Sequence, residues 1–476
     1  MNNVILVTID CLRIDRITSY PFIAKNIKNL AEKSIFFSQA IAPAPWTLPS
    51  FISILTATYP LMHRIRADVC WKGVKHLKRH KIDMELPIEA RASFSNLAKR
   101  LLAKGYLTLC LHSNPHLGSK YFANIRRSFN FFKDISSEGS SQRVVALADG
   151  IVKILHGAPM KIIQRMSRFS SELYSRFYQL IYKPLYPSAE ELFQEALWLV
   201  KWCRNTRVKR FFLWVHCMDT HEPYIPPADY LEGLGWNLRE ALREYWEIFF
   251  KLSYDPDEIS HKDLKTLRML YDLGVRYVDS RFKYFLEKLE EMGFLDGGTI
   301  VILTADHGEL LGEHDAVGHG GLLYDELLSV PLIIYSPSLS LHMRIDRQVA
   351  LMDLSSMILK LTEDDPSSLI RGKLISDGHR ENAVISEYAG VGVRMFSYRS
   401  RGWKYILTIR HGSWSEELYN IASDPRESIN LINEKADVAS EFRARLLDHI
   451  KMEIRFNRFV SKSRALKRAI NAVKLK

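Results

Sequence analysis

The sequence predicts an α/β protein in which helices flank a doubly wound, mostly parallel β-sheet. Up to about residue 335, short apolar and β-branched runs alternate with longer stretches of helical periodicity, a pattern typical of parallel sheets. The apolar runs are nearly continuous, as in strands that are covered by helices on both faces. After about residue 380 the pattern changes to short alternating strands separated by glycine-containing turns. This change predicts a small C-terminal antiparallel α+β subdomain.

The expected strands of the larger sheet can be located from these apolar runs. They are Asn3–Ile9, Ser34–Ile41, Tyr106–Leu111, Arg210–Val215, Thr299–Thr304 and Val330–Tyr335. Helices are expected over Ser93–Lys104 and over much of residues 236–295. In open α/β sheets, ligands bind at the carboxyl ends of the strands, so we expect the functional site there.

The chain divides into three predicted parts. Residues 1–380 form the α/β domain, with a basic helical insertion at about 140–195. Residues 381–445 form the small antiparallel subdomain, and residues 446–476 form a basic helical tail. The expected strands of the subdomain are Ala383–Glu387, Val393–Tyr398 and Trp403–Arg410.

Composition favours a globular cytoplasmic protein. Hydrophobic residues make up 47% of the chain and charged residues 25%, which is ordinary for a soluble domain. The five cysteines are scattered without CxxC spacing, so a disulfide framework and a structural zinc site are not expected. The first apolar run breaks at Asp10 without a preceding basic region, and no run approaches the ~20 residues needed to span a bilayer. We therefore expect neither a signal peptide nor a transmembrane segment.

The net charge of +12 is unevenly distributed along the chain. Basic residues gather in Lys72–Lys81, Arg143–Lys183 and Arg443–Lys476, and such stretches can bind an anionic membrane or substrate or can simply be solvated. Residues 151–186 fit either a peripheral membrane contact or an insertion packed on the core, and we favour the packed insertion. A nucleic-acid partner is not expected, and the oligomeric state stays open.

The segment Ala44–Pro60 contains a candidate nucleophile. A proline-rich turn leads to Thr47, and Pro49 suits the first turn of the apolar helix that follows. Unpaired backbone N–H groups and the helix dipole favour negative charge at such a position. The Thr47 hydroxyl could therefore attack phosphorus or sulfur, whereas the ordinary alternative is a threonine that only caps the helix.

Acidic residues and histidines follow several of the predicted strands. Asp10 ends the first strand, Asp306 and His307 follow Thr299–Thr304, and His216, Asp219 and His221 follow Arg210–Val215. Together they offer the mixed oxygen and nitrogen ligands that suit zinc or manganese. Because these groups end strands of one sheet, we prefer a metal centre to a set of turn residues and helix caps.

Five segments, in this order, resemble the sulfatase family of the alkaline-phosphatase superfamily over nearly the whole chain. They are VILVTIDCLRID (4–15), WTLPSFISILTATYP (46–60), HCMDTHEPYIPP (216–227), LTADHGELLGEH with GHGGLLYDELLSVPLII (303–334), and ELYNIASDPRESINL (417–431). The resemblance implies an alkaline-phosphatase-like fold and a metal-dependent reaction on an anionic ester.

The resemblance also implies roles for individual residues. Asp10 corresponds to the first metal carboxylate, and Asp306 with His307 corresponds to the later metal pair. Thr47 stands at the position of the nucleophile, which also reaches the metal. His221 matches a histidine that contacts the substrate oxygens or protonates the leaving group.

Further roles rest on looser matches. His319 falls where the family has a lysine or histidine facing the transferred group, although it could be an ordinary loop residue. His116 and its neighbour Asn114 are candidates for catalysis and substrate binding, respectively. Asp219 is a candidate ligand of a second metal.

Several nearby residues have plainer expected roles. We expect Glu309 to cap a helix, and Arg13 and Asp15 to be solvated charges. His216 and His314 stay open.

Three departures from the family pattern bear on function. Thr47 replaces the cysteine or serine that sulfatases oxidise to formylglycine, and Phe51 replaces an arginine. Cys11 replaces a second carboxylate, which favours zinc or manganese over calcium.

Three functions therefore stay open. The first is cleavage of a phosphate-type ester, by a hydrolase or transferase, through a covalent ester on Thr47. The second is hydrolysis of a sulfuric ester by unmodified Thr47. The third is binding of an anionic glycan or lipid without catalysis. The basic aromatic insertion hints at a glycan-linked or lipid-linked substrate.

Overall fold

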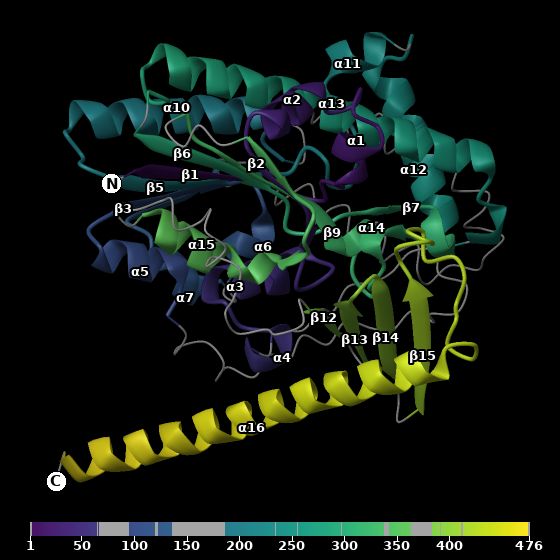
Figure 1. Cartoon of the computed structure of the whole chain (residues 1–476). Helices are drawn as coiled ribbons and strands as arrows, with labels where there is room; N and C mark the ends of the chain where they lie inside the picture. Colours follow the sequence, from purple (N-terminus) through teal and green to yellow (C-terminus); the bar gives the residue numbers. More distant parts are fainter. Residues whose placement is uncertain are drawn as a thin grey trace.

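A sheet of nine strands forms the centre of the computed structural model (Figure 1). The structure describes residues 2–63, 65, 95–119, 122–135, 186–233, 235–254, 256–296, 298–337, 342–362, 383–390, 392–410 and 413–474. In spatial order the strands are β10 (Met343–Ile345), β2 (Ile35–Ile41), β9 (Ser329–Tyr335), β6 (Thr299–Thr304), β1 (Asn3–Ile9), β5 (Phe211–Cys217), β3 (Leu107–His112) and β4 (Phe131–Asp134). The ninth strand, β11 (Val349–Ala350), pairs with β2.

The sheet is mostly parallel, as predicted. Strands β6, β1, β5, β3 and β4 pair in parallel, whereas β9 runs antiparallel to both β6 and β2. Between β6 and β9 the chain forms the hairpin of β7 (Leu310–Leu311) and β8 (Val317–Gly318), with the single 3-10 turn η4 (Glu313–Asp315) at its tip, and the short helix α14 (Asp325–Leu328). A parallel connection needs a crossover that returns to the opposite edge of the sheet. Because this segment contains no such crossover, β9 starts at the carboxyl end of β6 and runs back.

Helices cover both faces of the sheet, as the continuous apolar strands predicted. On one face lie α2 (Lys25–Glu32), α10 (Ala189–Asn205) and α13 (His261–Glu291), which contact one another or the strands below. On the other lie α3 (Thr47–Thr56), α5 (Leu97–Ala103) and α15 (Leu354–Leu361) (Figure 1). None of the helices in the described ranges is both long and apolar enough to cross a bilayer.

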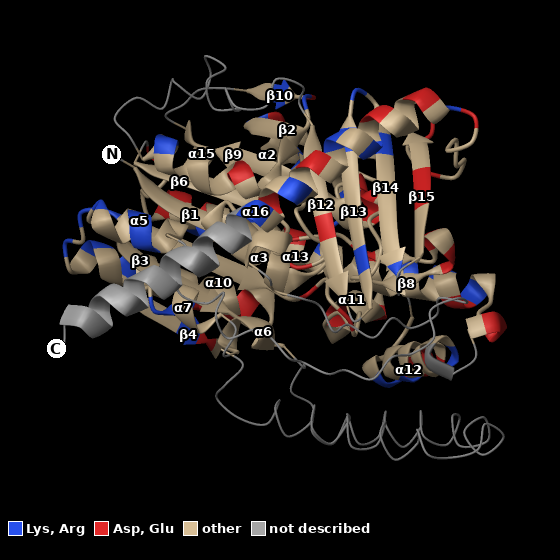
Figure 2. Ribbon diagram, turned by 90° about the horizontal axis from the view of Figure 1, so that it is seen from below, with Lys and Arg blue, Asp and Glu red and all other residues tan. Residues whose placement is uncertain are grey.

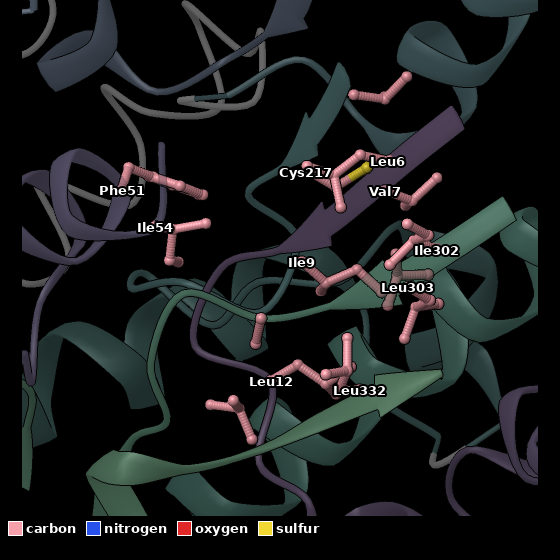
Figure 3. Packing of buried hydrophobic residues seen from close by; sticks show 14 of the residues in the cluster. Leu6, Val7, Ile9, Leu12, Phe51, Ile54, Cys217, Ile302, Leu303 and Leu332 are labelled. Atoms are coloured by element: carbon pink, nitrogen blue, oxygen red, sulfur yellow. The ribbon is translucent and has the colours of Figure 1, made fainter. Parts of the chain in front are cut away.

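The core contains apolar side chains from the central strands and from α3. Figure 3 shows Leu6 and Ile9 of β1 with Ile302 of β6, and Phe51 and Ile54 projecting from α3. All five are at most 2% exposed. Burial on this scale stabilises the fold by about 1.5–3 kcal/mol for each large apolar side chain. The strand ends that carry the polar residues are therefore held by a rigid core.

Strand positions agree closely with the sequence prediction, while the short strands were missed. Asn3–Ile9 and Thr299–Thr304 are reproduced residue for residue. Strands β4, β10 and β11 have two to four residues each, which is too short for periodicity to identify them. Helix α5 begins after Asn96, whose side chain accepts a hydrogen bond from Lys99 N.

The predicted insertion at about 140–195 is described only at its end. Residues 136–185 lie outside the described residues, and so does the whole basic stretch at 72–81. The final residues belong to α10, where Leu192 and Phe193 are buried against the core. Residues 189–195 are therefore part of a helix that packs on the sheet, starting from a capping box of Ser188 and Glu191.

A second, antiparallel sheet follows in the C-terminal part, as predicted, but its fourth strand, Ser413–Asn420, was missed. Its strands are β12 (Val384–Gly390), β13 (Val393–Ser400), β14 (Trp403–Arg410) and β15 (Ser413–Asn420). The long helix α16 (Ala436–Lys474) lies against β13, β14 and the short helix α4 (Pro60–His63) (Figures 1 and 2). The predicted subdomain boundaries, 381–445 and 446–476, stay predictions; α16 itself starts at Ala436.

A buried ion-pair group ties this second sheet to the larger one. Lys404 of β14 is 1% exposed, and its Nζ lies 2.8 Å from Asp325 Oδ1 and 2.8 Å from Glu427 Oε1. Arg399 of β13 contacts the other oxygen of Asp325 at 2.6 Å. Asp325 opens α14, which precedes β9, so this group holds the small sheet against the chain segment between β6 and β9.

Removing the Lys404 ammonium would leave buried carboxylates without their partner. Lys404→Ala is expected to lower the free energy of unfolding by about 3–5 kcal/mol, measured by denaturant titration. Lys283→Ala, which removes an exposed pair with Glu287, is the matched control and should change it by less than about 0.5 kcal/mol. A loss below about 1 kcal/mol in Lys404→Ala would contradict this role.

Candidate active site

Asp10 lies at the centre of a buried polar cluster at the carboxyl ends of the parallel strands. Its side chain is fully buried after β1, between β5 and β6. Asn114 Nδ2 donates to Asp10 Oδ2 at 2.9 Å, and His216 Nε2 lies 3.3 Å from the same oxygen. Cys11 Sγ donates to Oδ1 at 3.1 Å, and His307 Nε2 lies 3.5 Å from it. The parallel pairing of β3, β5, β1 and β6 therefore brings together residues that are far apart in sequence.

Thr47 faces this cluster from the first turn of α3. Trp46 has extended backbone angles (φ −163°, ψ 161°), and the helix begins at Thr47, as the sequence predicted. The Thr47 hydroxyl is 2% exposed and lies 3.4 Å from Asp10 Oδ2 and 3.3 Å from His307 Nε2. Ser50, in the same helical turn, donates to the backbone oxygen of Asp306 at 2.7 Å. This contact fixes the start of α3 to the end of β6.

Phe51 contributes packing and no charge to the site. It lies one turn after Thr47 and is 1% exposed. Its ring centroid is 4.9 Å from that of Trp214 and 4.8 Å from that of His216. His216 Nδ1 lies 2.9 Å from Thr8 Oγ1, so the ring that contacts Asp10 is held between Phe51 and β1.

Asp306 and His307 follow β6 and complete the cluster. Both carboxylate oxygens of Asp306 are buried and lack a hydrogen-bond partner, and Oδ2 lies 3.5 Å from His307 Nε2. His307 Nδ1 lies 2.8 Å from Gly308 O, so it donates to that carbonyl and leaves Nε2 as a free acceptor or ligand. A Cβ on Gly308 would lie 2.0 Å from Glu326 O, so only glycine fits this turn.

The electrostatics of the cluster match a site for a cation. Burial and the carboxylate of Asp10 raise the pKa of Asp306 well above its usual range. Burial also opposes ionisation of Asp10, but its hydrogen bond with His216 and its charge interactions with His221 and His307 outweigh that effect and hold its pKa well below its usual range. Two buried carboxylates so close together are costly unless positive charge offsets them.

The donor atoms also fit a divalent metal. One ligand atom from each of Asp10, His216 and Asp306 lies within 4.8 Å of the others, and the same holds for Asp10, Cys11 and His307. With the unpartnered oxygens of Asp306, this arrangement suits a metal bound by oxygen and nitrogen. The neighbouring Cys11 thiol is a soft donor, which fits zinc better than calcium.

Two further histidines lie above the cluster. His319 Nδ1 lies 3.1 and 3.2 Å from the two carboxylate oxygens of Glu309, and its ring centroid is 4.7 Å from that of His307. The ring of His221 is 4.9 Å from that of His319. Burial lowers the pKa of His319, but Glu309 outweighs burial and raises it to about 9. His319 is therefore protonated at neutral pH and able to give up a proton.

The loop that carries His319 depends on glycine at both sides. Gly318 and Gly320 have φ values of +97° and +82°, which non-glycine residues rarely adopt. Gly320 N donates to Pro45 O at 2.8 Å, and this bond joins the loop to the turn before Thr47. The structure thus brings Asp10, Thr47, His221, Asp306, His307 and His319 into one site.

The other predicted site residues lie at different distances from this centre. Asn114 contacts Asp10 directly. His116 is exposed, with its ring centroid 6.1 Å from that of Trp46, beside the Thr47 turn. Asp219 Oδ1 instead accepts from Ala189 N at 3.0 Å, and burial raises its pKa to about 7. In the described ranges Asp219 joins none of the ligand groups around Asp10, and it serves the start of α10.

Two expectations about neighbouring residues were wrong. Glu309 caps no helix: it is fully buried and contacts His319. Arg13 is not solvated: it is 6% exposed and donates to Glu309 O at 3.0 Å and to Asp15 and Glu313. The turn after β1 thus carries Arg13 inward, against the loop that carries Glu309, and this tertiary contact has no signal in the local sequence.

Of the two histidines left open, His216 contacts Asp10. His314 instead stacks on Tyr324 at a centroid distance of 3.6 Å.

Comparison with known proteins places this fold in a recognised class. Two solved structures cover most of the chain. A putative sulfatase yidJ from Bacteroides fragilis has a TM-score of 0.64 and 16% identity, over 95% of this chain and 96% of that one. A phosphonate monoester hydrolase of Agrobacterium radiobacter has a TM-score of 0.62 and 17% identity, over the same shares. At these identities the likeness shows the fold, which is the predicted sulfatase-like α/β architecture.

The sequence comparisons show the family. A family model described as Sulfatase matches residues 2–364, so this chain belongs to the sulfatase family. An uncharacterized sulfatase YidJ of Escherichia coli is 31% identical over 264 residues, which is 50% of this chain and 51% of that protein. The chain thus spans about half of that curated relative.

Proposed function

We propose that this protein cleaves a phosphate-type ester, or a sulfate ester, in a metal-dependent reaction with Thr47 as the nucleophile. The observation that carries the proposal is the position of the Thr47 hydroxyl. It lies at the N-terminus of α3, within 3.4 Å of Asp10 and His307. The helix N-terminus favours a negatively charged group at this point. Family membership supports ester cleavage as the reaction class.

Asp10, Asp306 and His307 would hold the metal, with Thr47 beside it. Zinc or manganese suits these donors better than calcium, and the Cys11 thiol, 3.1 Å from Asp10 Oδ1, supports this preference. A bound divalent ion would lower the pKa of the hydroxyl and offset the charge of the transferred group.

The reaction would proceed in two halves, formation of the threonine ester and its cleavage. Thr47 would react as the alkoxide, after releasing its proton to water. In the first half, Thr47 Oγ1 forms a bond to the phosphorus or sulfur and the bond to the leaving oxygen breaks. The leaving oxygen takes a proton from His319 or His221. In the second half, water or an acceptor alcohol attacks the threonine ester and gives a proton to that histidine, and Thr47 leaves as the alkoxide that began the reaction.

Thr47 itself favours phosphate over sulfate. Threonine cannot follow the oxidation to formylglycine that the resemblance implies for sulfatases. The name of the Agrobacterium radiobacter neighbour, a phosphonate monoester hydrolase, is consistent with a phosphorus ester. The name of the relative in Escherichia coli, an uncharacterized sulfatase, keeps a sulfuric ester hydrolase as the second candidate.

For the substrate and the location, we propose only a general class. An anionic ester, glycan-linked or lipid-linked, fits the basic character of the chain. The cytoplasmic location and a peripheral membrane contact through the insertion or the tail stay predictions from the sequence. Most of the insertion lies outside the described residues.

Metal content and ester cleavage by purified protein test the proposal. We expect zinc or manganese by elemental analysis, and cleavage of an aryl phosphate or phosphodiester that falls by at least about 1,000-fold in Thr47→Ala. Thr56→Ala, in the last turn of the same helix, is the matched control and should keep its activity. Sulfate release that depends on Thr47 would favour the second candidate. Absence of both metal and turnover would indicate a binding protein.

A second experiment tests leaving-group protonation by His319. We expect His319→Ala, and Glu309→Gln to a smaller extent, to lower kcat/KM for a phenyl or alkyl ester by about 100-fold. The loss should be much smaller for a 4-nitrophenyl ester, whose leaving group needs no proton. Equal losses for both esters would contradict acid catalysis at this position and would indicate that His319 only binds the substrate.

A further inference from the structure

A second group of buried ionisable side chains lies between β12 and α16, on elements that contribute nothing to the site around Asp10. Glu387 of β12 is 2% exposed, and His449 and Glu453 of α16 are 8% and 2% exposed. His449 Nε2 lies 2.9 Å from Glu387 Oε1 and 3.3 Å from Glu453 Oε1. One ligand atom from each residue lies within 4.8 Å of the others.

Glu453 is the member of this group whose carboxylate lacks a hydrogen-bond partner. Both of its carboxylate oxygens are buried and lack a hydrogen-bond partner, although Oε1 points to the same histidine nitrogen as Glu387. Among the described residues, His449 is the only basic side chain that pairs with either glutamate. One imidazole can neutralise only one of two buried carboxylates, so the other must either hold a proton or meet a further positive charge.

The surroundings of the group are apolar and aromatic. The ring of Tyr59 lies 4.6 Å from the ring of His449, at an angle of 79°. Between the small sheet and α16 lies a hydrophobic cluster that includes Phe396, Tyr398 and Leu407 of the sheet and Phe442 of the helix. An apolar shell of this kind excludes water and strengthens the demand for a positive charge between the carboxylates.

The arrangement has the chemistry of a metal site. His449 and Glu453 are four residues apart on one helix, so their side chains share a face, and Glu387 faces them from the neighbouring strand. One imidazole nitrogen and two carboxylate oxygens form a three-ligand set that binds zinc with a fourth position open. We propose that Glu387, His449 and Glu453 form a second divalent-cation site, best suited to zinc and separate from the site around Asp10.

This second site would brace the segment that carries Thr47. The other carboxylate oxygen of Glu387 accepts a hydrogen bond from Leu61 N at 2.7 Å, in α4. The backbone N of Glu387 donates to Pro43 O at 2.9 Å. Pro43 and Leu61 flank the segment that contains α3, so a cation on Glu387 would fix both ends of that segment to α16. The proposed role is therefore structural, and it does not depend on the reaction at Thr47.

Zinc titration of the full chain tests the site apart from the first metal. Metal-free Asp306→Asn protein, whose first site is impaired, should still bind one equivalent of zinc by calorimetry. Zinc should also raise its melting temperature by at least about 2 °C. Asp306→Asn combined with Glu453→Gln should weaken that binding by at least tenfold and lose the thermal shift. Asp306→Asn combined with Glu441→Gln, a change at an exposed position of the same helix, is the matched control.

Two results would overturn the proposal. One is that Asp306→Asn binds no zinc, or binds it equally well with and without Glu453→Gln. The other is that Glu453→Gln raises the melting temperature of metal-free protein while zinc has no effect on the unsubstituted cluster, which would indicate a glutamate pair that shares a proton. Neither result bears on ester cleavage, because Thr47-dependent turnover is measured separately.

Discussion

The site depends on two neighbouring carboxylates, Asp10 and Asp306, whose negative charges are costly to bury side by side. Asp10 and Asp306 end adjacent parallel strands, β1 and β6, and both are fully buried. The register of these strands aligns Thr8 with Thr304, so the two acidic residues emerge at the same edge of the sheet. Rigid apolar packing below prevents them from separating. The resulting demand for positive charge explains why histidines and a helix N-terminus converge on this point.

The remainder of the fold holds the partners of these carboxylates in place. The start of α3 is fixed to β6 by the bond from Ser50 to Asp306 O, and the His319 loop is fixed to Pro45. Because β9 runs antiparallel to β6, the chain between these two strands stays at the carboxyl edge of the sheet. There it forms the loop that carries His319. The small C-terminal sheet is held to a later part of the same segment, at the start of α14, by the ion pair of Lys404 with Asp325.

Sequence alone predicted the parts of this structure that depend on local patterns. The apolar runs located the long strands, and the position of Pro49 predicted the start of a helix beside Thr47, which the structure confirms. Patterns of the same kind could not assign Glu309 or Arg13, because both are buried by tertiary contacts between distant segments. The antiparallel direction of β9 was also not predicted. It follows from the absence of a crossover helix between β6 and β9, which strand periodicity does not show.

Asp219 illustrates a different limit of sequence reasoning. It follows β5 in the same segment as His221, yet its side chain turns to the N-terminus of α10. Whether the Asp219 side chain reaches the site or the start of α10 depends on the path of the backbone after β5, which the sequence does not show. The cluster of Glu387, His449 and Glu453 likewise joins residues more than sixty positions apart, and no motif in the sequence announces it.

Trapping the reaction intermediate tests the central claim most directly. Protein that is turning over an aryl phosphate would be quenched in acid, digested and examined by mass spectrometry. The account predicts one phosphoryl group on Thr47 in the peptide that contains α3, and no such group in Thr47→Ala. A phosphoryl group on another residue, or product formation without any modified peptide, would contradict a covalent reaction at Thr47.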